Sequence, residues 1–276
     1  MRPMASPNNG ADAALLAKIT RRNSAIQPGR NRATVNRMSG AALHVVFDIA
    51  AWLAAGAAAF WLSRARHLRF PAQSFALPYI AALVFGAGLG AYLFGTLNLF
   101  LSGSPGLARS VEGAIAGGIV AIELYKWQNG ISLRTGARFA LPLAIGIAVG
   151  RLGCFFAGLD DFTYGTPTML AWGHDFGDGI ARHPVQLYES AAMAAFAIFY
   201  VVAVVRRNNF IVDNGFYLVL AFYGMQRFVW EFLKPYAALI GPLTLFHLLS
   251  LAILFYAAVM LVTAPVVKVA HERAVA

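Results

Sequence analysis

The sequence has 276 residues, of which 59% are hydrophobic and 12% are charged. A soluble domain carries about twice that share of charged residues, so the composition excludes a water-soluble globule. The single Cys154 excludes a framework of internal disulfides, and the 26 Gly and 12 Pro follow no strict period. A membrane protein is the class that remains.

The formal net charge of +10 is concentrated near the N-terminus, where residues 1–42 hold seven basic residues and one acid. A basic segment beside a membrane is typical of headgroup contact or topology control, so no nucleic-acid partner is expected. The segment has no apolar periodicity and no signal-peptide core. We predict a disordered basic tail over residues 1–42, with Met38 as an alternative start.

Seven apolar stretches approach the length of about 17–25 residues that crosses a hydrocarbon core. Because irregular backbone cannot face lipid, we predict an all-α fold, a polytopic seven-transmembrane-helix bundle over residues 43–264, with a short tail at 265–276. The stretches are Leu43–Leu62, Phe75–Phe100, Val111–Trp127, Phe139–Ala157, Val185–Val205, Gly215–Leu233 and Leu239–Val262.

Glycine pairs within these stretches have the four-residue spacing that lets helices approach closely, which favours helix packing over ligand binding. They are Gly86/Gly90, Gly113/Gly117 and Gly146/Gly150.

Loop charge predicts the orientation, because cytoplasmic loops are enriched in Lys and Arg. The connections after the odd-numbered stretches, with the C-terminal tail, hold ten basic residues: Arg64, Arg66, Arg69, Lys126, Arg134, Arg138, Arg206, Arg207, Lys268 and Arg273. The opposite loops hold Arg109, Arg182 and Lys234. We expect the C-terminus in the cytoplasm and the N-terminus outside.

Seven formal charges interrupt the stretches: Asp48, Glu112, Glu123, Arg151, Glu189, Arg227 and Glu231. Each costs about 2.5–3.5 kcal/mol at mid-bilayer on insertion scales. We therefore expect these side chains to face the bundle interior and to pair with one another or with a ligand.

The sixth stretch places Tyr223, Arg227 and Glu231 on one helical face at intervals of four, and Lys234 continues the row. Two interpretations stay open for this row. Arg227 and Glu231 form an internal pair that neutralises itself, or the row lines a ligand site.

The fourth stretch ends in GRLGCFFAG, Gly150–Gly158. Small residues around Arg151 leave room for a phosphate to reach the guanidinium, which suits phosphate through paired hydrogen bonds. Arg151 and Arg227 on facing helices would form a phosphate clamp for an anionic phospholipid. Cys154 is a small packing residue or, beside Arg151, a nucleophile.

The loop between the fourth and fifth stretches predicts an interfacial half-helix marked by three aromatic residues, Tyr164, Trp172 and Phe176. A metal-binding alternative would use His174, Asp175, Asp178 and His183, but their spacing matches no known metal site. We expect no metal and no other cofactor.

Three motifs in order, GRLGCFFAG, RHPVQLYES and YGMQRFVWEF, resemble the prolipoprotein diacylglyceryl transferases of bacterial inner membranes. The resemblance covers about Ala91–Leu249. It implies transfer of a diacylglyceryl group from phosphatidylglycerol to the cysteine thiol of a lipoprotein precursor, with release of glycerol phosphate. The arginines would stabilise charge on the departing phosphate while the thiol attacks the glycerol carbon.

By the same resemblance, Arg151 and Arg227 are the expected catalytic residues. The expected substrate-binding residues are Gly153, Cys154, Gly158, His183, Gln186, Tyr188, Glu189, Tyr223 and Glu231.

The chain departs from the family pattern in four places. Cys154 and Ala157 stand where the family has asparagines, its acidic turn here reads Leu159, Asp160 and Asp161, and Glu112 stands where the family has the histidine of a His-Gly-Gly segment. Glu112 is therefore the candidate proton acceptor. We expect an inner-membrane transferase acting on phosphatidylglycerol and a thiol or related acceptor. A non-catalytic phospholipid-binding or transport protein that lost the base is the alternative, and a metal-dependent enzyme using the His/Asp loop is a third.

Overall fold

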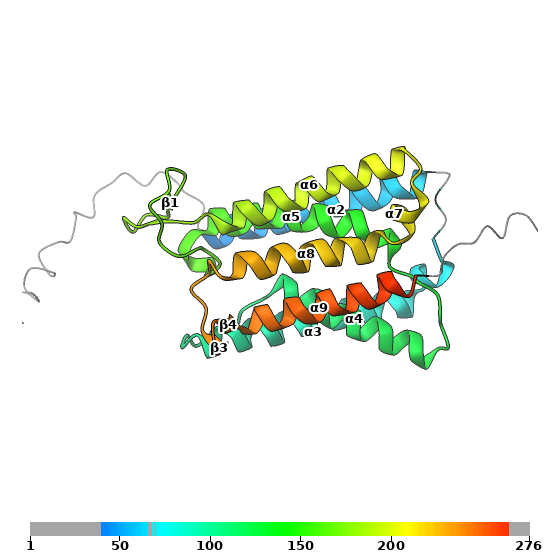
Figure 1. Ribbon diagram of the computed structural model, residues 1–276, viewed down its shortest axis with the longest axis horizontal. Coiled ribbons are helices and arrows are strands. Elements are labelled where there is room, and N and C mark those ends of the chain that lie inside the picture. Colours follow the sequence, from blue (N-terminus) through cyan, green and yellow to red (C-terminus); the bar gives the residue numbers. More distant parts are fainter. Residues whose placement is uncertain (1–39, 66–67, 69, 265–276) are drawn as a thin grey trace, which may run out of the picture. The chain divides into compact units, whose positions relative to one another are not determined.

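The computed structural model describes residues 40–264, apart from residues 66, 67 and 69. The predicted tails at 1–39, including Met38, and at 265–276 lie outside the described residues, whereas residues 40–42 already belong to the first helix. The described elements in chain order are α2 (Gly40–Arg64), η1 (Ala72–Phe75), α3 (Leu77–Leu101), α4 (Val111–Gln128), η2 (Ala137–Phe139), α5 (Ala140–Ala157), η3 (Gly158–Asp161), β1 (His174–Asp175), β2 (Ala181–Arg182), α6 (Val185–Val205), α7 (Asn209–Asp213), α8 (Gly215–Glu231), β3 (Ala238–Ile240), β4 (Leu243–Thr244) and α9 (Leu245–Val262) (Figure 1).

Five helical segments of the described chain are long and apolar enough to cross a membrane: Ala42–Arg64, Leu77–Leu101, Ala137–Asp161, Val185–Val205 and Leu245–Val262. Large apolar side chains on their outer faces are exposed, for example Trp52 at 78% and Phe85 and Phe255 at 72% each. An apolar surface of this extent is unfavourable in water and suits lipid. The helices are therefore those of a polytopic membrane protein.

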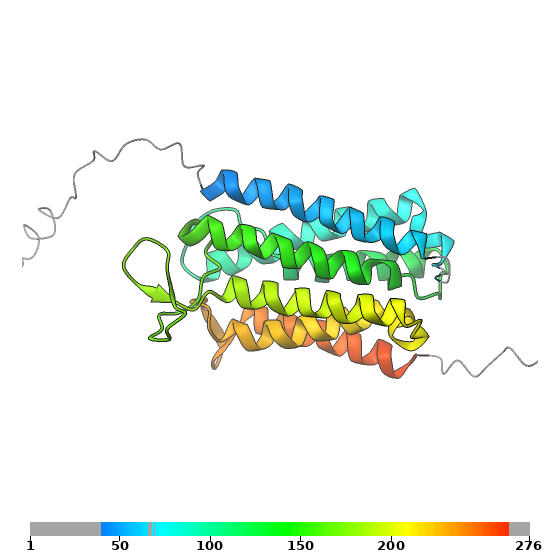
Figure 2. The same ribbon diagram turned by 90° about the horizontal axis from the view of Figure 1, so that it is seen from above.

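The remaining long helices of the described part, α4 and α8, carry charge into the bundle. α4 contains Glu112, Glu123 and Lys126, and α8 has 17 residues with Arg227 near its end. Figure 1 shows α8 between α6 and α9, and α8 contacts both helices. Figure 2 shows α2 lying along α5, and these two helices are in extensive contact.

Glycines hold α3 directly against α4. A Cβ on Gly90 would lie 2.2 Å from the Gly113 carbonyl oxygen, and a Cβ on Gly117 would lie 2.2 Å from the Gly86 carbonyl oxygen. Two predicted glycine pairs thus face each other across this helix interface, and the packing interpretation is confirmed for both. The third pair, Gly146/Gly150, faces alanines of α2 at 3.6 Å or more.

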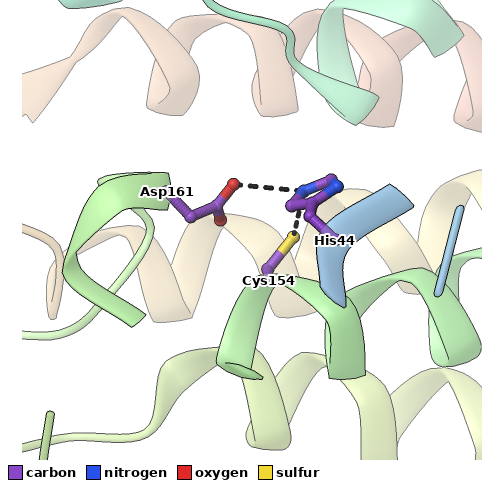
Figure 3. Close-up of side chains that lie close together, drawn as sticks. All are labelled: His44, Cys154 and Asp161. Carbon is purple, nitrogen blue, oxygen red and sulfur yellow. Dashed lines mark hydrogen bonds and ion pairs between the residues drawn. The ribbon is translucent and has the colours of Figure 1, made fainter. Parts of the chain in front are cut away.

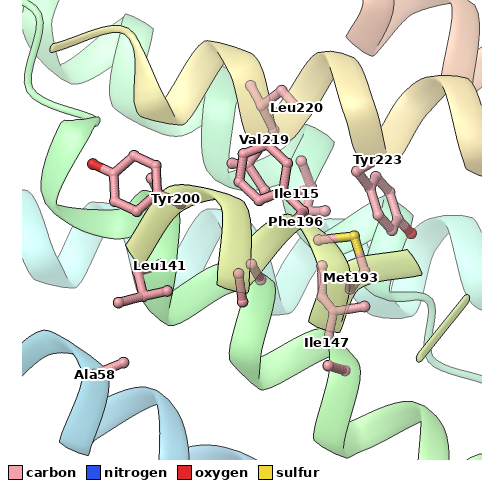
Figure 4. Close-up of a cluster of buried hydrophobic side chains, with 14 of the residues drawn as sticks. Ala58, Ile115, Leu141, Ile147, Met193, Phe196, Tyr200, Val219, Leu220 and Tyr223 are labelled. Carbon is pink, nitrogen blue, oxygen red and sulfur yellow. The ribbon is translucent and has the colours of Figure 1, made fainter. Parts of the chain in front are cut away.

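The apolar core lies mainly between α5, α6 and α8 (Figure 4). Met193 and Tyr200 of α6 and Leu220 of α8 are fully buried there. Tyr223 belongs to the same cluster, so the core reaches the face of α8 that carries Arg227 one turn later. Close packing of these side chains fixes the direction of the polar residues beside them.

The seventh predicted stretch, Leu239–Val262, starts too early. Residues 238–244 form the antiparallel pair β3–β4, and α9 begins at Leu245. Gly241 has a φ of +56° and is followed by Pro242, which together make a turn inside the apolar run. Thr244 then caps α9 by accepting the backbone N–H of His247.

The predicted half-helix between α5 and α6 is also wrong. Within described residues 162–184 the chain forms the short antiparallel pair β1–β2 and no helix. Gly177 and Gly179 have φ values of +106° and +83°, and the Asp175 carboxylate accepts both of their backbone N–H groups. Glycines and an Asp-stabilised turn favour a hairpin over helix in this segment.

The close approach of α3 to α4 predicts a sharp difference between two glycines of α3. Gly90→Ala would drive a methyl group into the backbone of α4 and should destabilise the fold by about 1–3 kcal/mol. Gly88→Ala is the matched control because a Cβ there meets nothing within 4 Å. Thermal unfolding in detergent should show a lower midpoint for Gly90→Ala only, and equal midpoints would contradict the packing.

Candidate active site

Six charged side chains are buried together where several helices meet. They come from α4, α5, α6, α8 and the turn after α8, and none is more than 6% exposed. The cations are Arg151, Arg227 and Lys234, and the carboxylates are Glu112, Glu189 and Glu231. The expectation that intramembrane charges face inward and pair is confirmed for Glu112, Arg151, Glu189, Arg227 and Glu231, whereas Asp48 and Glu123 are paired but 32% and 39% exposed.

Glu189 of α6 is the centre of this charged cluster. Its Oε1 lies 2.7 Å from Arg227 Nη1 and 2.9 Å from Lys234 Nζ. Its Oε2 lies 2.5 Å from Arg151 Nε. The two groups form an ion pair without the geometry of a hydrogen bond. One carboxylate therefore brings the two predicted arginines together from α5 and α8.

The two arginines differ in how many of their nitrogens are occupied. Arg227 contacts three carboxylates: Nε lies 3.0 Å from Glu112 and Nη2 lies 2.8 Å from Glu231, in addition to the Nη1 contact with Glu189. Arg151 contacts Glu189 alone, and its Nη1 lies 3.8 Å from Cys154 Sγ. Within the described residues, Arg151 Nη2 has no partner.

Hydroxyl groups at the start of α9 hold the outer carboxylates. Ser250 Oγ donates to Glu112 Oε1 at 2.5 Å, and Thr244 Oγ1 donates to Glu231 Oε1 at 2.7 Å. Both oxygens of Glu112 are thus occupied, one by Ser250 and the other by Arg227. This fixes Arg227 more firmly than a single ion pair would.

The cluster is electrically balanced when all six groups are charged. Burial lowers the pKa of Lys234 to about 8, and the neighbouring Arg227 guanidinium acts in the same direction. Lys234 is therefore mostly protonated at neutral pH. A bound anion would add one negative charge to this balanced set.

Several buried polar atoms beside the cluster have no hydrogen-bond partner in the described chain. They are Tyr223 Oη, both amide atoms of Gln186 and of Gln226, and Trp230 Nε1. Gln186 lies one turn before Glu189, and Tyr223 lies one turn before Arg227. An unpaired buried polar group costs about 1–3 kcal/mol, so such a group marks a position where a ligand or water supplies the partner.

An apolar cavity of about 310 Å³ runs along α4. Its lining starts at Val111, the neighbour of Glu112, and reaches Glu123 on the same helix. Ile115, Ile119 and Leu143 are among the apolar side chains between these ends. A polar cluster beside an apolar space suits a ligand with a charged head and hydrocarbon chains.

His183 and Tyr188 do not reach the charged cluster. His183 Nδ1 lies 3.4 Å from Tyr188 Oη, and Trp172 Nε1 donates to the same hydroxyl at 2.9 Å. The Tyr188 ring also packs on Trp230, with 5.2 Å between ring centroids. These residues form an aromatic rim on the loop side of the cluster.

Gly153 and Gly158 each have a role in the backbone. A Cβ on Gly153 would lie 2.6 Å from Phe47 Cβ, so this glycine lets α2 pack on α5. Gly158 has a φ of +70° and ends α5.

The loop residues of the metal-binding alternative are not brought together. The His174 ring packs between Phe155 and Phe176, with 4.7 Å between centroids on each side. Asp175 accepts the turn hydrogen bonds, and Asp178 forms two 2.7 Å contacts with Arg182. That guanidinium holds the pKa of Asp178 below its usual value.

A second polar group, not predicted from the sequence, consists of His44, Cys154 and Asp161 (Figure 3). His44 Nε2 of α2 lies 3.2 Å from Asp161 Oδ1 and 3.8 Å from Cys154 Sγ. The signal that could have found it is the four-residue spacing of His44 and Asp48 on one helix, where Nδ1 and Oδ2 are 3.2 Å apart.

Comparison with known proteins identifies the family. The model of the prolipoprotein diacylglyceryl transferase family matches residues 42–263, nearly all of the described chain. The chain belongs to the prolipoprotein diacylglyceryl transferase family. The resemblance expected from the three motifs is confirmed, and the protein is a membrane transferase by family.

Individual relatives of the diacylglyceryl transferase family agree. A phosphatidylglycerol–prolipoprotein diacylglyceryl transferase of Geobacter sulfurreducens is 34% identical over 181 residues, covering 61% of this chain and 68% of the relative. The protein of the same name from Ectopseudomonas mendocina is 30% identical over 205 residues, covering 67% and 74%. That of Solidesulfovibrio magneticus is 32% identical over 196 residues, covering 64% and 71%.

The central position of Glu189 predicts a large loss of stability when its charge is removed. Glu189→Gln leaves three buried cations facing two carboxylates, and breaking a buried pair costs about 3–5 kcal/mol. Asp178→Asn is the control, because this carboxylate is exposed and pairs with Arg182 in the loop between α5 and α6, and exposed pairs contribute about 1 kcal/mol or less. Thermal unfolding in detergent should separate the two variants, and similar midpoints would contradict the central role of Glu189.

Proposed function

We propose that this protein transfers a diacylglyceryl group from phosphatidylglycerol to the thiol of a cysteine in a lipoprotein precursor or a related acceptor. The relatives from Geobacter sulfurreducens and Ectopseudomonas mendocina carry the name of this reaction. Membership of the family and the buried arginines support the same activity in this chain.

The observation that carries the proposal is the incomplete use of Arg151. Among the described residues only its Nε contacts a carboxylate, that of Glu189, while Nη1 lies 3.8 Å from Cys154 Sγ. The unpaired Tyr223 hydroxyl and Gln186 amide lie beside the same cluster. We assign phosphate binding to Arg151 with these neutral donors, and we assign Arg227 to holding the site together through three carboxylates.

The cavity along α4 would hold hydrocarbon of the lipid. It starts beside Glu112 and is lined mainly by apolar side chains. A lipid with its phosphate at Arg151 could place acyl-chain carbons there, away from the charged cluster. The glycerol carbon that reacts would then lie between the two regions.

The reaction breaks the bond between the glycerol carbon and the phosphate oxygen and forms a thioether. Glycerol phosphate leaves with the electrons of the broken bond, and the proton of the thiol ends on the departing phosphate or in water. Arg151 would stabilise the charge that grows on the departing phosphate. Binding the phosphate in a site closed to water strengthens this interaction.

Glu112 was the candidate proton acceptor, and its contacts favour a different role. Both carboxylate oxygens are engaged, by Arg227 at 3.0 Å and by Ser250 at 2.5 Å. Accepting a proton would require one of these contacts to break. We infer that Glu112 mainly anchors Arg227.

The contacts of Glu112 with Arg227 and Ser250 also support the alternative function, a non-catalytic phospholipid-binding or transport protein. A phospholipid-binding protein that retained the charged cluster and lost a free base would show the same arrangement of Glu112 and Arg227. It would retain phosphatidylglycerol through purification without consuming it. Turnover of the lipid distinguishes the two functions.

We further propose seven membrane-spanning helices in the bacterial inner membrane, α2, α3, α4, α5, α6, α8 and α9, with the loop between α5 and α6 facing outward. The loops after α4 and α6 lie at the same end as the end of α9, since Arg134 donates to the Met260 carbonyl and to Asn214. These basic loops support a cytoplasmic C-terminus and an outward N-terminus.

The proposal predicts that Arg151→Gln reduces turnover by about 100-fold or more, the usual effect of removing one oxyanion-stabilising donor. The assay follows labelled phosphatidylglycerol converted to glycerol phosphate by the purified protein with a peptide that carries the acceptor cysteine. Arg182→Gln is the control, because this arginine pairs with Asp178 in the exposed loop.

Tyr223→Phe tests the neutral donor in the same assay and should reduce turnover while the protein remains folded, because the hydroxyl has no partner to lose among the described residues. Turnover by Arg151→Gln equal to that of the parent would refute phosphate binding by Arg151. Bound lipid without any turnover by the parent would instead establish the binding function.

A further inference from the structure

We propose that His44, Cys154 and Asp161 form a binding site for a zinc-class divalent metal ion with one open coordination position. The three residues come from α2, α5 and η3, and their ligand atoms all lie within 4.8 Å of one another. This departs from the sequence-based expectation that no metal is bound. The proposal does not depend on the transferase activity.

Two of the three distances between the ligand atoms are close to those around a tetrahedral ion. Zinc–ligand bonds of about 2.0–2.3 Å with tetrahedral angles separate a sulfur and a nitrogen ligand by about 3.6 Å, and a nitrogen and an oxygen ligand by about 3.4 Å. The corresponding separations here are 3.8 Å for Cys154 Sγ and His44 Nε2, and 3.2 Å for His44 Nε2 and Asp161 Oδ1. The third separation, between Cys154 Sγ and the Asp161 carboxylate, is no more than 4.8 Å, compared with about 3.5 Å around a tetrahedral zinc ion, so binding requires these two ligands to approach each other.

Two of the three ligands, His44 and Asp161, are oriented by a contact on their other side. His44 Nδ1 lies 3.2 Å from Asp48 Oδ2, which suits the tautomer that leaves the Nε2 lone pair for a metal. Thr163 Oγ1 donates to Asp161 Oδ2, so that Oδ1 faces His44. Carboxylate–histidine and hydroxyl–carboxylate pairs of this kind orient metal ligands in proteins.

The backbone brings the ligands together at a close helix contact. Gly153 precedes Cys154, and a Cβ there would lie 2.6 Å from Phe47 Cβ of α2. The ligand side chains retain limited solvent access, with 20% exposure for His44 and 16% for Asp161. An ion could therefore enter from the end of the bundle where η3 lies.

The mixed sulfur, nitrogen and oxygen set selects the class of ion. Thiolate with imidazole favours zinc over calcium or magnesium, which prefer oxygen ligands alone. Three protein ligands leave a fourth position for water or another small ligand. The competing arrangement without metal is a protonated His44 that bridges Asp48 and Asp161.

Cobalt provides a direct test, because the chain contains a single cysteine. The full chain is purified in detergent with an affinity tag that lacks histidine, freed of metal by a chelator, and titrated with Co²⁺. We expect a thiolate-to-cobalt charge-transfer band that saturates at about one ion per chain and disappears when Zn²⁺ is added. No charge-transfer band in the folded parent overturns the proposal without any variant.

Variants then assign the ligands. Cys154→Ser should abolish the band, and Asp48→Asn should weaken Co²⁺ binding by about 10–100-fold while keeping the band. Asp178→Asn is the control, because it removes an exposed carboxylate of the loop and should bind Co²⁺ like the parent. The assignment would be overturned by a band of unchanged intensity in Cys154→Ser. Equal binding of zinc by Cys154→Ser and by the parent would also overturn it.

Discussion

The site depends on one carboxylate, Glu189, that holds three cations inside the bundle. Without it, Arg151, Arg227 and Lys234 would face one another in a region of low dielectric, where like charges repel strongly. Glu112 and Glu231 complete the balance through Arg227. Buried ion pairs contribute little net stability compared with apolar packing, so this cluster is better explained by the need to position charge than by the need to stabilise the fold.

The equal numbers of basic and acidic side chains in the cluster explain why we assign phosphate binding to Arg151 and a structural role to Arg227. A phosphate brings negative charge into a set that is already neutral, so it binds most easily to a guanidinium with nitrogens to spare. Arg151 has them and Arg227 does not. Glycine-mediated helix packing makes the arrangement possible, because Gly153 lets α2 approach the turn of α5 that carries Arg151 and Cys154.

Much of this arrangement was predictable from the cost of charge in a membrane. That cost predicts that Arg151, Glu189 and Arg227 face inward and pair, and the structure shows both ion pairs. The bounds of the apolar stretch Val185–Val205 coincide with those of α6. The sequence also places Glu231 one turn after Arg227, and the two residues form an ion pair.

Contacts between distant segments were not predictable. The sequence does not reveal that His44 lies beside Cys154, because this depends on how α2 packs against α5. The pattern of spare and occupied nitrogens on Arg151 and Arg227 likewise depends on all surrounding helices at once. The turn at Gly241–Pro242 was missed because apolar residues flank it, so hydropathy alone continues through it.

A structure with phosphatidylglycerol bound would test directly whether Arg151 binds the phosphate. We expect a phosphate oxygen about 3 Å from Nη1 or Nη2 of Arg151, which is a charge-assisted hydrogen-bond distance. Arg227 should keep its contacts with Glu112, Glu189 and Glu231. A phosphate bound at Arg227 with those carboxylates displaced, or bound away from both arginines, would contradict it.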